Sequence, residues 1–333
     1  NNDDTFSKKE KRKEYRLLAF VAKGKGIFKF LIVIGSLLTV LVIFLVSYVI
    51  FDSNIYDELY SKIEVTAHRG NSTVTMPNTI PAFKEAIKEG ADYGELDVRQ
   101  TKDNVIVVTH DASLKEMTGQ DINVRDLTYE ELQKIPCIEV NGNKCTVPKL
   151  EDVINVCKGK IKLNIEIKTG NNDSEDFVSD VVKIIENTDF VDKCVVTSLD
   201  YRALRKVKEC NPKIKTGYIM AVAMGDFYDL PCVDFFRMET TFVNGRVVER
   251  AHKLNKEIHV WTVNDDDSLK KCVELEVDNI ITDNVAGAKS AIATHGDDVF
   301  SIVLNQLKES DNSKENIKKT NRILEDVTGI EGA

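Results

Sequence analysis

Between residues 63 and 292, short apolar runs take turns with longer amphipathic stretches. Apolar runs of this length favour strands, and stretches with apolar residues three and four apart favour helices. The predicted strands lie at 65–68, 93–98, 105–110, 162–168, 194–198, 216–220, 234–238, 258–263 and 279–282. The predicted helices lie at 79–89, 128–134, 149–157, 175–187, 200–208, 244–254, 266–275 and 285–292. Such alternation indicates parallel strands joined by crossover helices.

This repeat predicts a (β/α)8 barrel of the TIM type over residues 63–292, because roughly eight strand–helix units fit a chain of this length. A doubly wound open sheet is the alternative, but no GxGxxG motif follows the first strand. Residues 111–148 interrupt the repeat with turn signals such as Asn141-Gly142-Asn143, so we expect a small inserted subdomain there. Residues 293–333 are polar and charged, and we expect a C-terminal helix and tail.

The composition changes before the predicted barrel, where residues 30–51 form an uncharged and mostly apolar run. At about 1.5 Å per residue a helix of this length spans roughly 33 Å, close to the roughly 30 Å hydrocarbon core of a bilayer. We therefore predict a transmembrane helix, preceded by a basic segment at 1–29 and followed by a linker at 52–62. A buried core helix is the alternative. A cleaved signal peptide does not fit, because the run is too long and no small-residue cleavage site follows it.

Charge predicts how this helix is oriented. Residues 1–29 carry nine Lys and Arg against four Asp and Glu, so the positive-inside rule places the N-terminus in the cytoplasm and the large domain outside the cell membrane. Beyond residue 29 the chain holds 50 acidic and 36 basic side chains. An acidic domain argues against nucleic acid as a ligand.

All seven cysteines lie in the predicted outer domain, and their number is odd. They form no CxxC pair or Cys/His cluster of the kind that binds zinc. Cys137 and Cys145 flank the turn signal at 140–143, so a disulfide across a hairpin is one interpretation. Buried free thiols are the other.

Candidate chemistry lies at the ends of the predicted strands. Acidic, basic and histidine side chains occur there as His68, Arg69, Glu95, Asp97, His110, Glu166 and Lys168. In a barrel of parallel strands, the carboxyl ends of the strands meet at one face, so these side chains should converge. Each residue alone has an ordinary structural explanation. Their recurrence at successive strand ends is what indicates a site.

The residue types suggest three separate roles: metal binding, phosphate binding and proton transfer. Three carboxylates offer hard oxygen ligands for calcium or magnesium, and without a cation or a proton they would repel one another. Arg69 and Lys168 suit the anionic oxygens of a phosphate. His68 and His110 can supply a general base and a general acid near neutral pH. Together these groups indicate cleavage of a phosphodiester.

The same residues stand in motifs that closely resemble the glycerophosphodiester phosphodiesterase family. The motifs are AHRG (67–70), NTIPAF (78–83), GADYGELDVRQTKDNVIVVTHD (90–111), LTYEEL (127–132), VPKLEDV (147–153), LNIEIK (163–168), VWTVND (260–265) and DNIITDN (278–284). The resemblance covers about 65–292. The preceding apolar segment also resembles the membrane-bound bacterial branch of the family, which often has more membrane helices upstream.

The resemblance implies a metal-dependent hydrolase on a TIM-type barrel that releases sn-glycerol 3-phosphate and an alcohol. Residue by residue, it assigns catalysis to His68 and His110, metal binding to Glu95, Asp97 and Glu166, and substrate binding to Arg69, Lys168 and Trp261. Trp261 matches an aromatic residue that lines the pocket, although a role in the barrel core is its other interpretation. The insertion at 111–148 matches a subdomain characteristic of the family.

Two positions depart from the family pattern. Pro77 stands where the family usually has Glu, which puts in doubt any supporting role of that carboxylate. Gly94 stands where an apolar β-branched residue is usual, and it should slightly loosen its strand. The alternative functions are a related diesterase acting on lysophospholipids or on a glycerophosphate cell-wall polymer, a binding protein without turnover, and a structural surface protein.

Overall fold

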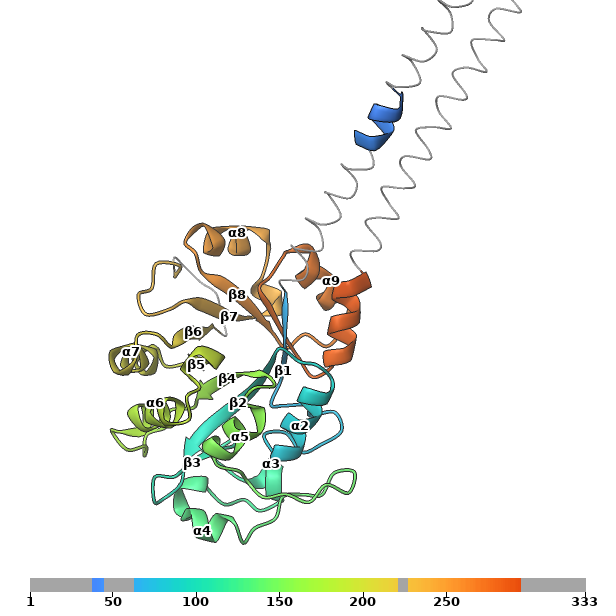
Figure 1. Cartoon of the computed structure of the whole chain (residues 1–333). Helices are drawn as coiled ribbons and strands as arrows, with labels where there is room; N and C mark the ends of the chain where they lie inside the picture. Colours follow the sequence, from blue (N-terminus) through green and yellow to red (C-terminus); the bar gives the residue numbers. More distant parts are fainter. Residues whose placement is uncertain (1–37, 45–62, 221–226, 295–333) are drawn as a thin grey trace, which may run out of the picture. The chain divides into compact units, whose positions relative to one another are not determined.

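The protein is described by a computed structural model that covers residues 38–44, 63–220 and 227–294 (Figure 1). Within these residues, eight parallel strands follow one another around a ring, and β1 pairs with both β2 and β9 to close it. The strands of the ring are β1 (Glu64–Ala67), β2 (Tyr93–Gln100), β4 (Lys162–Ile167), β5 (Cys194–Ser198), β6 (Lys215–Met220), β7 (Phe235–Glu239), β8 (Glu257–Trp261) and β9 (Asn279–Thr282). The predicted TIM-type barrel is confirmed.

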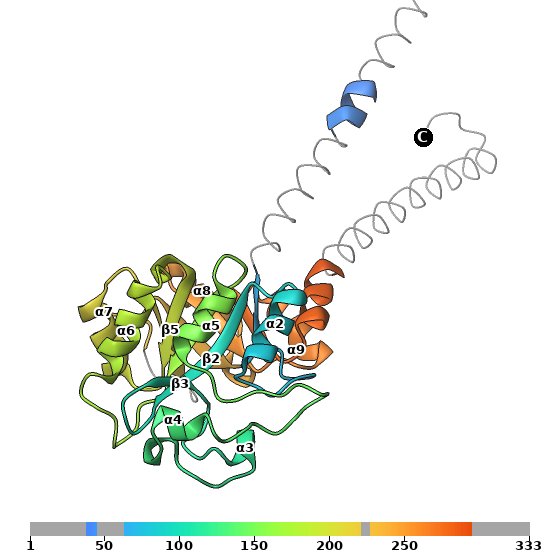
Figure 2. The same ribbon diagram turned by 60° about the horizontal axis from the view of Figure 1, so that its bottom comes forward.

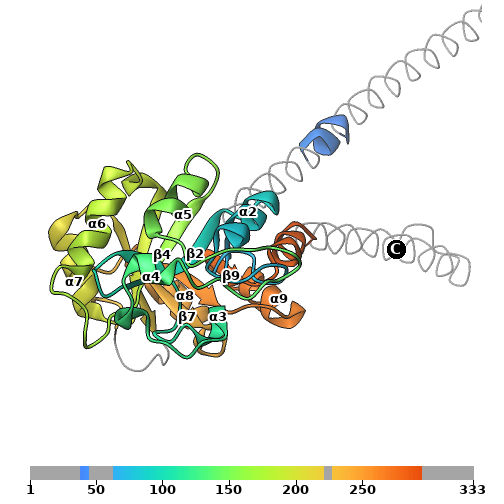
Figure 3. The same ribbon diagram turned by 90° about the horizontal axis from the view of Figure 1, so that it is seen from below.

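Helices surround the ring of strands (Figures 1 and 3). They are α2 (Ile80–Lys88), α5 (Leu150–Cys157), α6 (Phe177–Asn187), α7 (Tyr201–Cys210), α8 (Gly245–Lys253) and α9 (Asp266–Glu274), followed by a helix over 285–294. A short 3-10 turn, η2 (Val191–Lys193), precedes β5, and η3 (Thr240–Phe242) follows β7. Of the described residues between β6 and β7, none is helical, which agrees with the absence of a helical stretch there in the sequence.

The two faces of each strand have different neighbours. In β2, Leu96 and Val98 belong to the main hydrophobic core between the strands and the helices. Tyr93 lies on the opposite face and packs in a separate cluster with Val195 and Phe235, which come from β5 and β7. Because side chains alternate along a strand, Glu95 and Asp97 share the interior face with Tyr93. The barrel interior therefore holds this small cluster, buried polar pairs such as Thr66 with Asn279, and charged side chains toward the carboxyl ends of the strands. These carboxyl ends are here called the barrel mouth.

Gly94 is explained by a large neighbour. A side chain at this position would meet the Phe83 ring at 3.0 Å and the Ile161 side chain at 3.3 Å. Phe83, on α2, is fully buried. The missing side chain on β2 is therefore compensated by an aromatic ring that packs directly over the strand.

The segment between β2 and α5 forms a separate layer with its own core. Its elements are β3 (Ile106–Val108), α3 (Lys115–Thr118), η1 (Val124–Asp126) and α4 (Tyr129–Leu132). β3 runs antiparallel to β2 and lies outside the ring, so the strand expected at 105–110 is a hairpin partner and the departure from the repeat begins before residue 111. A second hydrophobic core holds the segment together and includes Leu114, Met117 and Leu132. Figure 2 shows α3 and α4 beyond the end to which the β2 arrow points.

The predicted membrane segment is described only in part. Residues 38–44 form a helix whose large apolar side chains, including Leu41 and Phe44, are exposed. The rest of the expected span at 30–51, the basic segment at 1–29, the linker up to residue 62 and the tail beyond 294 lie outside the described residues. Among the helices that are described, none has both the length and the apolar character needed to cross a bilayer.

The seven cysteines all fall within the described residues, and none of them forms a disulfide. The Cys137 amide donates to the Cys145 carbonyl oxygen at 2.9 Å, so these two residues do face each other across the turn. Burial raises the pKa of the thiols of Cys157, Cys194 and Cys272 to about 12, which keeps them protonated and unreactive near neutral pH.

We predict that Gly217→Ala destabilises the barrel from inside. A Cβ at Gly217 would lie 2.1 Å from Cε2 of Phe235, and this ring cannot retreat because it stacks on the His259 imidazole at 4.0 Å. Overpacking of this kind lowers the free energy of unfolding by about 1–3 kcal/mol, measurable as a lower urea midpoint. Gly245→Ala is the matched control. Its Cβ would lie 3.8 Å from Leu275 at the start of α8, and stability should be unchanged or slightly higher. Equal midpoints for Gly217→Ala and the wild type would contradict the packing described here.

Candidate active site

Three carboxylates meet in the barrel interior near the mouth. Glu95 and Asp97 come from the inner face of β2, and Glu166 comes from β4, where it is the register partner of Asp97. All three side chains are buried, and one carboxylate oxygen of each lies within 4.8 Å of the others. The structure therefore brings together the three carboxylates that the sequence placed at strand ends.

Two predicted basic residues lie against these carboxylates. Lys168, directly after β4, places Nζ 2.5 Å from Glu166 Oε1 and 3.3 Å from Asp97 Oδ1. Arg69 follows β1 with Nε 3.8 Å from Asp97 Oδ2, and its amide donates to Glu95 Oε2 at 2.9 Å. The backbone of Arg69 has a φ of 52°, so a left-handed turn aims both its amide and its side chain at the site.

Asn78, which the residue-by-residue reasoning did not single out, holds Asp97 in place. Its Nδ2 donates to Asp97 Oδ2 at 2.9 Å, and its Oδ1 accepts from the Asp97 amide at 3.3 Å. The φ of Asn78 is 60°, a conformation that asparagine tolerates better than most residues. Burial favours a raised pKa for Asp97, but the charges of Lys168 and His110 and the Asn78 hydrogen bond outweigh it and lower that pKa. The carboxylate is therefore ionised.

Arg237, on β7, is a second residue that the sequence reasoning missed. Its Nη1 donates to Glu95 Oε1 at 2.9 Å and to Glu166 Oε2 at 2.8 Å, and the side chain is only 3% exposed. Burial would lower the pKa of its guanidinium, but the charges of Glu95 and Glu166 raise it, so Arg237 remains charged. The signal was a single arginine in the otherwise apolar run FFRM at 235–238. Part of the counter-charge that the carboxylates require thus comes from the chain itself.

His68 is held by the first and last strands of the ring. Its amide donates to the Thr282 carbonyl oxygen at 2.9 Å, and its Nδ1 lies 2.9 Å from Asp283 Oδ1. Asp283 also accepts from Ser72 Oγ at 3.0 Å and from Asn264 Nδ2 at 2.6 Å. The hydrogen bond from His68, together with these donors, lowers the pKa of Asp283 to about 2 despite its partial burial. A permanently ionised carboxylate therefore orients the imidazole.

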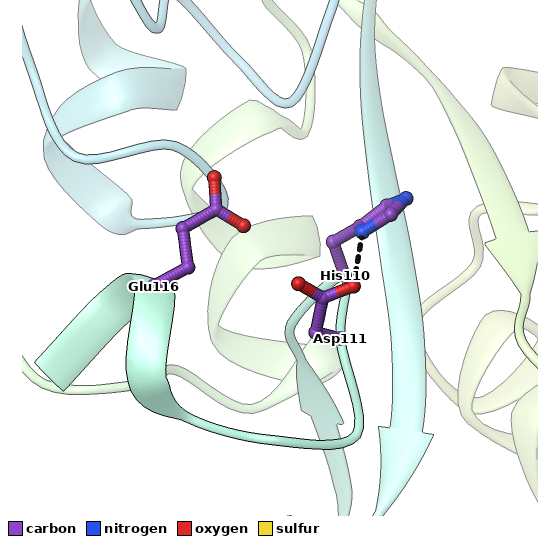
Figure 4. A group of neighbouring side chains, drawn as sticks. All are labelled: His110, Asp111 and Glu116. Atoms are coloured by element: carbon purple, nitrogen blue, oxygen red, sulfur yellow. Dashed lines mark hydrogen bonds and ion pairs between the residues drawn. The ribbon is translucent and has the colours of Figure 1, made fainter. Parts of the chain in front are cut away.

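His110 reaches the site from β3 rather than from a strand of the ring. Its Nδ1 lies 2.8 Å from Asp111 Oδ1, and its carbonyl oxygen accepts from Arg99 Nε at 2.8 Å. Figure 4 shows its ring and the carboxylates of Asp111 and Glu116 facing a common space, and one ligand atom of each lies within 4.8 Å of the others. Glu116, on α3, also lies 3.6 Å from Nη1 of Arg69. The inserted segment is therefore joined to the loop after β1 at the barrel mouth.

Trp261 ends β8 with its ring beside the charged cluster. The guanidinium carbon of Arg237 lies 5.5 Å from the ring centroid, and the buried indole Nε1 meets no hydrogen-bond partner in the part of the chain that the structure describes. The side chain is half-buried. Trp261 therefore lies at the edge of the site. Its position is compatible with both interpretations of the sequence, a residue that lines the pocket and a residue of the barrel core.

The carboxylate cluster has the donor set of a cation site. Among the described residues, none donates a hydrogen bond to the buried Asp97 Oδ1, although Lys168 Nζ forms an ion pair with it at 3.3 Å. An unsatisfied buried carboxylate oxygen is costly unless a cation or a donor meets it. Glu95, Asp97 and Glu166 offer only oxygen ligands, which hard divalent cations prefer. The residues present therefore fit such an ion.

A TIM-type barrel whose mouth combines buried carboxylates, basic side chains and two histidines has the groups that phosphodiester cleavage requires. The sequence profile of the Glycerophosphoryl diester phosphodiesterase family matches residues 68–286, and the chain belongs to this family. The chain is accordingly an enzyme with glycerophosphodiester phosphodiesterase activity.

Individual relatives agree with this placement. A glycerophosphodiester phosphodiesterase of Caldanaerobacter subterraneus is 31% identical over 230 residues, which are 67% of this chain and 95% of the relative. A lysophospholipase D of Mus musculus is 26% identical over 258 residues, covering 65% of this chain and 82% of the relative. A solved phosphodiesterase of Oleispira antarctica has the same fold at 23% identity, with a TM-score of 0.65 over 71% of this chain and 99% of its own.

Proposed function

We propose that the enzyme hydrolyses glycerophosphodiesters to sn-glycerol 3-phosphate and an alcohol at the barrel mouth, with one divalent cation, Ca²⁺ or Mg²⁺. The observation that carries this proposal is the cluster of buried carboxylates from Glu95, Asp97 and Glu166 beside Arg69 and Lys168. The Oleispira antarctica structure is described as a complex with the product sn-glycerol-3-phosphate, which supports this choice of product.

The binding roles follow from charge and position. The three carboxylates would hold the cation, which when bound neutralises negative charge that develops on phosphate oxygens. Arg69 and Lys168 lie beside the carboxylates and are assigned the remaining anionic oxygens of the substrate phosphate. The half-buried ring of Trp261 would contact the apolar part of the substrate and limit the access of water.

The two histidines are assigned the proton transfers. In each, Nδ1 is engaged by a carboxylate, Asp283 for His68 and Asp111 for His110. This arrangement sets the tautomer, so that Nε2 is the atom that exchanges a proton with the substrate. One imidazole takes a proton from the attacking oxygen, which is water or the glycerol 2-hydroxyl of the substrate. The other gives a proton to the leaving alcohol.

A glycerol 3-phosphate release assay tests the function. We expect the purified full chain in detergent to release glycerol 3-phosphate from glycerophosphocholine. Treatment with EDTA should abolish the release, and added Ca²⁺ or Mg²⁺ should restore it, because the buried carboxylates would otherwise lack the ion. Absence of glycerol 3-phosphate from every glycerophosphodiester tried, with either metal, would overturn the proposal.

The similarity to a lysophospholipase D favours one alternative substrate class. The same metal and histidine chemistry would then cleave lysophosphatidylcholine to a lysophosphatidic acid and choline. Parallel assays on glycerophosphocholine, lysophosphatidylcholine and a poly(glycerophosphate) polymer rank the three substrates by kcat/KM. The proposal requires the first to exceed the second.

Replacement of either catalytic histidine should remove most of the activity. We expect His68→Ala and His110→Ala each to lower kcat at least about 100-fold, because a positioned general acid or base contributes roughly that much. His252→Ala is the control, since His252 lies on α8 at the outside of the barrel, partly exposed and paired with Asp278. A histidine variant at position 68 or 110 that keeps near-full activity would refute the assignment for that residue.

We also propose that residues 30–51 anchor the enzyme in the cell membrane, with the N-terminus in the cytoplasm and the barrel outside. The exposed apolar side chains of the helix at 38–44 support the anchor. The basic residues of 1–29 support the orientation. The full chain should stay in the membrane pellet after an alkaline carbonate wash, and protease added to whole cells should cleave the barrel domain. Release by carbonate would contradict the anchor, and protection from the protease would contradict the orientation.

A further inference from the structure

The side chain of Arg237 crosses the barrel interior. In the ring order, β7 and β2 are separated by β8, β9 and β1 on one side and by β6, β5 and β4 on the other. Arg237 on β7 nevertheless contacts Glu95 on β2 and Glu166 on β4. These contacts therefore link opposite walls of the barrel through a side chain that is almost fully buried.

The competition between Arg237 and a metal ion depends on the position of one atom, Nη1 of Arg237. Nη1 of Arg237 lies 2.9 Å from an oxygen of Glu95 and 2.8 Å from an oxygen of Glu166, so one nitrogen is shared by two carboxylates. A divalent cation shared by the same two oxygens would sit about 2.0–2.6 Å from each. The nitrogen and a cation cannot both occupy the space between these oxygens.

We propose that Arg237 is a positioning residue that acts as an internal counter-cation and competes with the divalent metal for Glu95 and Glu166. The proposal rests on the metal site assigned under Proposed function. Arg237 keeps the carboxylates in place when no metal is bound, and a metal ion that binds through Glu95 Oε1 or Glu166 Oε2 must displace Nη1 from at least part of this contact. The enzyme should therefore be well folded without metal and should bind metal weakly.

The surroundings of the guanidinium support this role. Its Nε is buried and has no hydrogen-bond partner among the described residues, so the two glutamates do not use all of its donors. Its guanidinium carbon also lies over the face of Trp261, which stabilises a cation independently of the carboxylates. Lys168 and Arg69 hold other atoms of the cluster, namely Glu166 Oε1 and Asp97 Oδ2, and leave the oxygens bridged by Nη1 to Arg237.

Calorimetric titration of EDTA-stripped protein with Ca²⁺, and separately with Mg²⁺, tests the competition. Arg237→Met keeps a long apolar side chain but removes the charge, and we expect its Kd for metal to fall at least about tenfold below that of the wild type. Arg202→Met is the matched control, because Arg202 is 87% exposed and pairs with Asp200 at the start of α7. Its Kd should equal that of the wild type.

Thermal unfolding gives a second readout that does not depend on turnover. Without metal, Arg237→Met should unfold at a lower temperature than the wild type, because three buried carboxylates lose one counter-charge. Saturating metal should raise its Tm by more than it raises that of the wild type. Should Arg237→Met fail to fold, Arg237→Gln takes its place in both measurements, since glutamine keeps a hydrogen-bond donor without the charge.

The outcomes separate this inference from the metal proposal itself. A wild-type protein that binds metal, with neutral variants that bind it equally or more weakly, overturns the competition and leaves the metal site standing. Absence of metal binding in the wild type and in every variant overturns both. Measurable binding only in the neutral variants supports the competition and shows that Arg237 dominates the wild-type site.

Discussion

Three ionised or ionisable carboxylates buried within one barrel mouth impose the constraint on which this site depends. Each charge removed from water costs several kcal/mol unless cations or hydrogen-bond donors replace the solvent. Arg237 and Lys168 are two of the cations that surround the cluster, and Asn78 supplies both a donor and an acceptor to Asp97. The opposing directions of the pKa shifts, lowered for Asp97 and raised for Glu166 where burial prevails, show that this compensation is uneven across the cluster. This uneven compensation is what the proposed exchange of Arg237 for a divalent cation would use.

The barrel makes that burial feasible because each strand has one face toward the surrounding helices and one face toward the barrel interior. The outer faces pack against the helices, while the inner faces are divided along the strand direction. Tyr93, Val195 and Phe235 fill the interior below the charges, and Gly217 leaves room for the Phe235 ring. The three carboxylates above them are themselves buried. Their electrostatic contacts are therefore strengthened, because the local dielectric constant is low.

The barrel and the meeting of the three carboxylates could be predicted because period-two spacing and strand–helix alternation are local properties of the sequence. Glu95 and Asp97 two residues apart must share a face, whatever the rest of the chain does. Arg237 could not be placed in the same way, because its partners come from strands on the other side of the ring and its own strand has only one charged residue before Glu239. The pairing of β3 with β2 was missed for a related reason. An apolar run does not reveal whether its partner is parallel, and only the short turn before it hinted at a hairpin.

The two histidines depend on different parts of the fold, although both are held by a carboxylate. His68 is fixed by backbone and side-chain bonds to the last strand of the ring, through Thr282 and Asp283. His110 follows β3 and belongs to the inserted segment, whose packing relies on a separate small core. Glu116 of that segment contacts Arg69 of the barrel loop at 3.6 Å, an exposed ion pair of the kind that contributes little by itself. The relative position of the two imidazoles is therefore set mainly by the antiparallel pairing of β2 with β3, which ties His110 to the strand that carries Glu95 and Asp97.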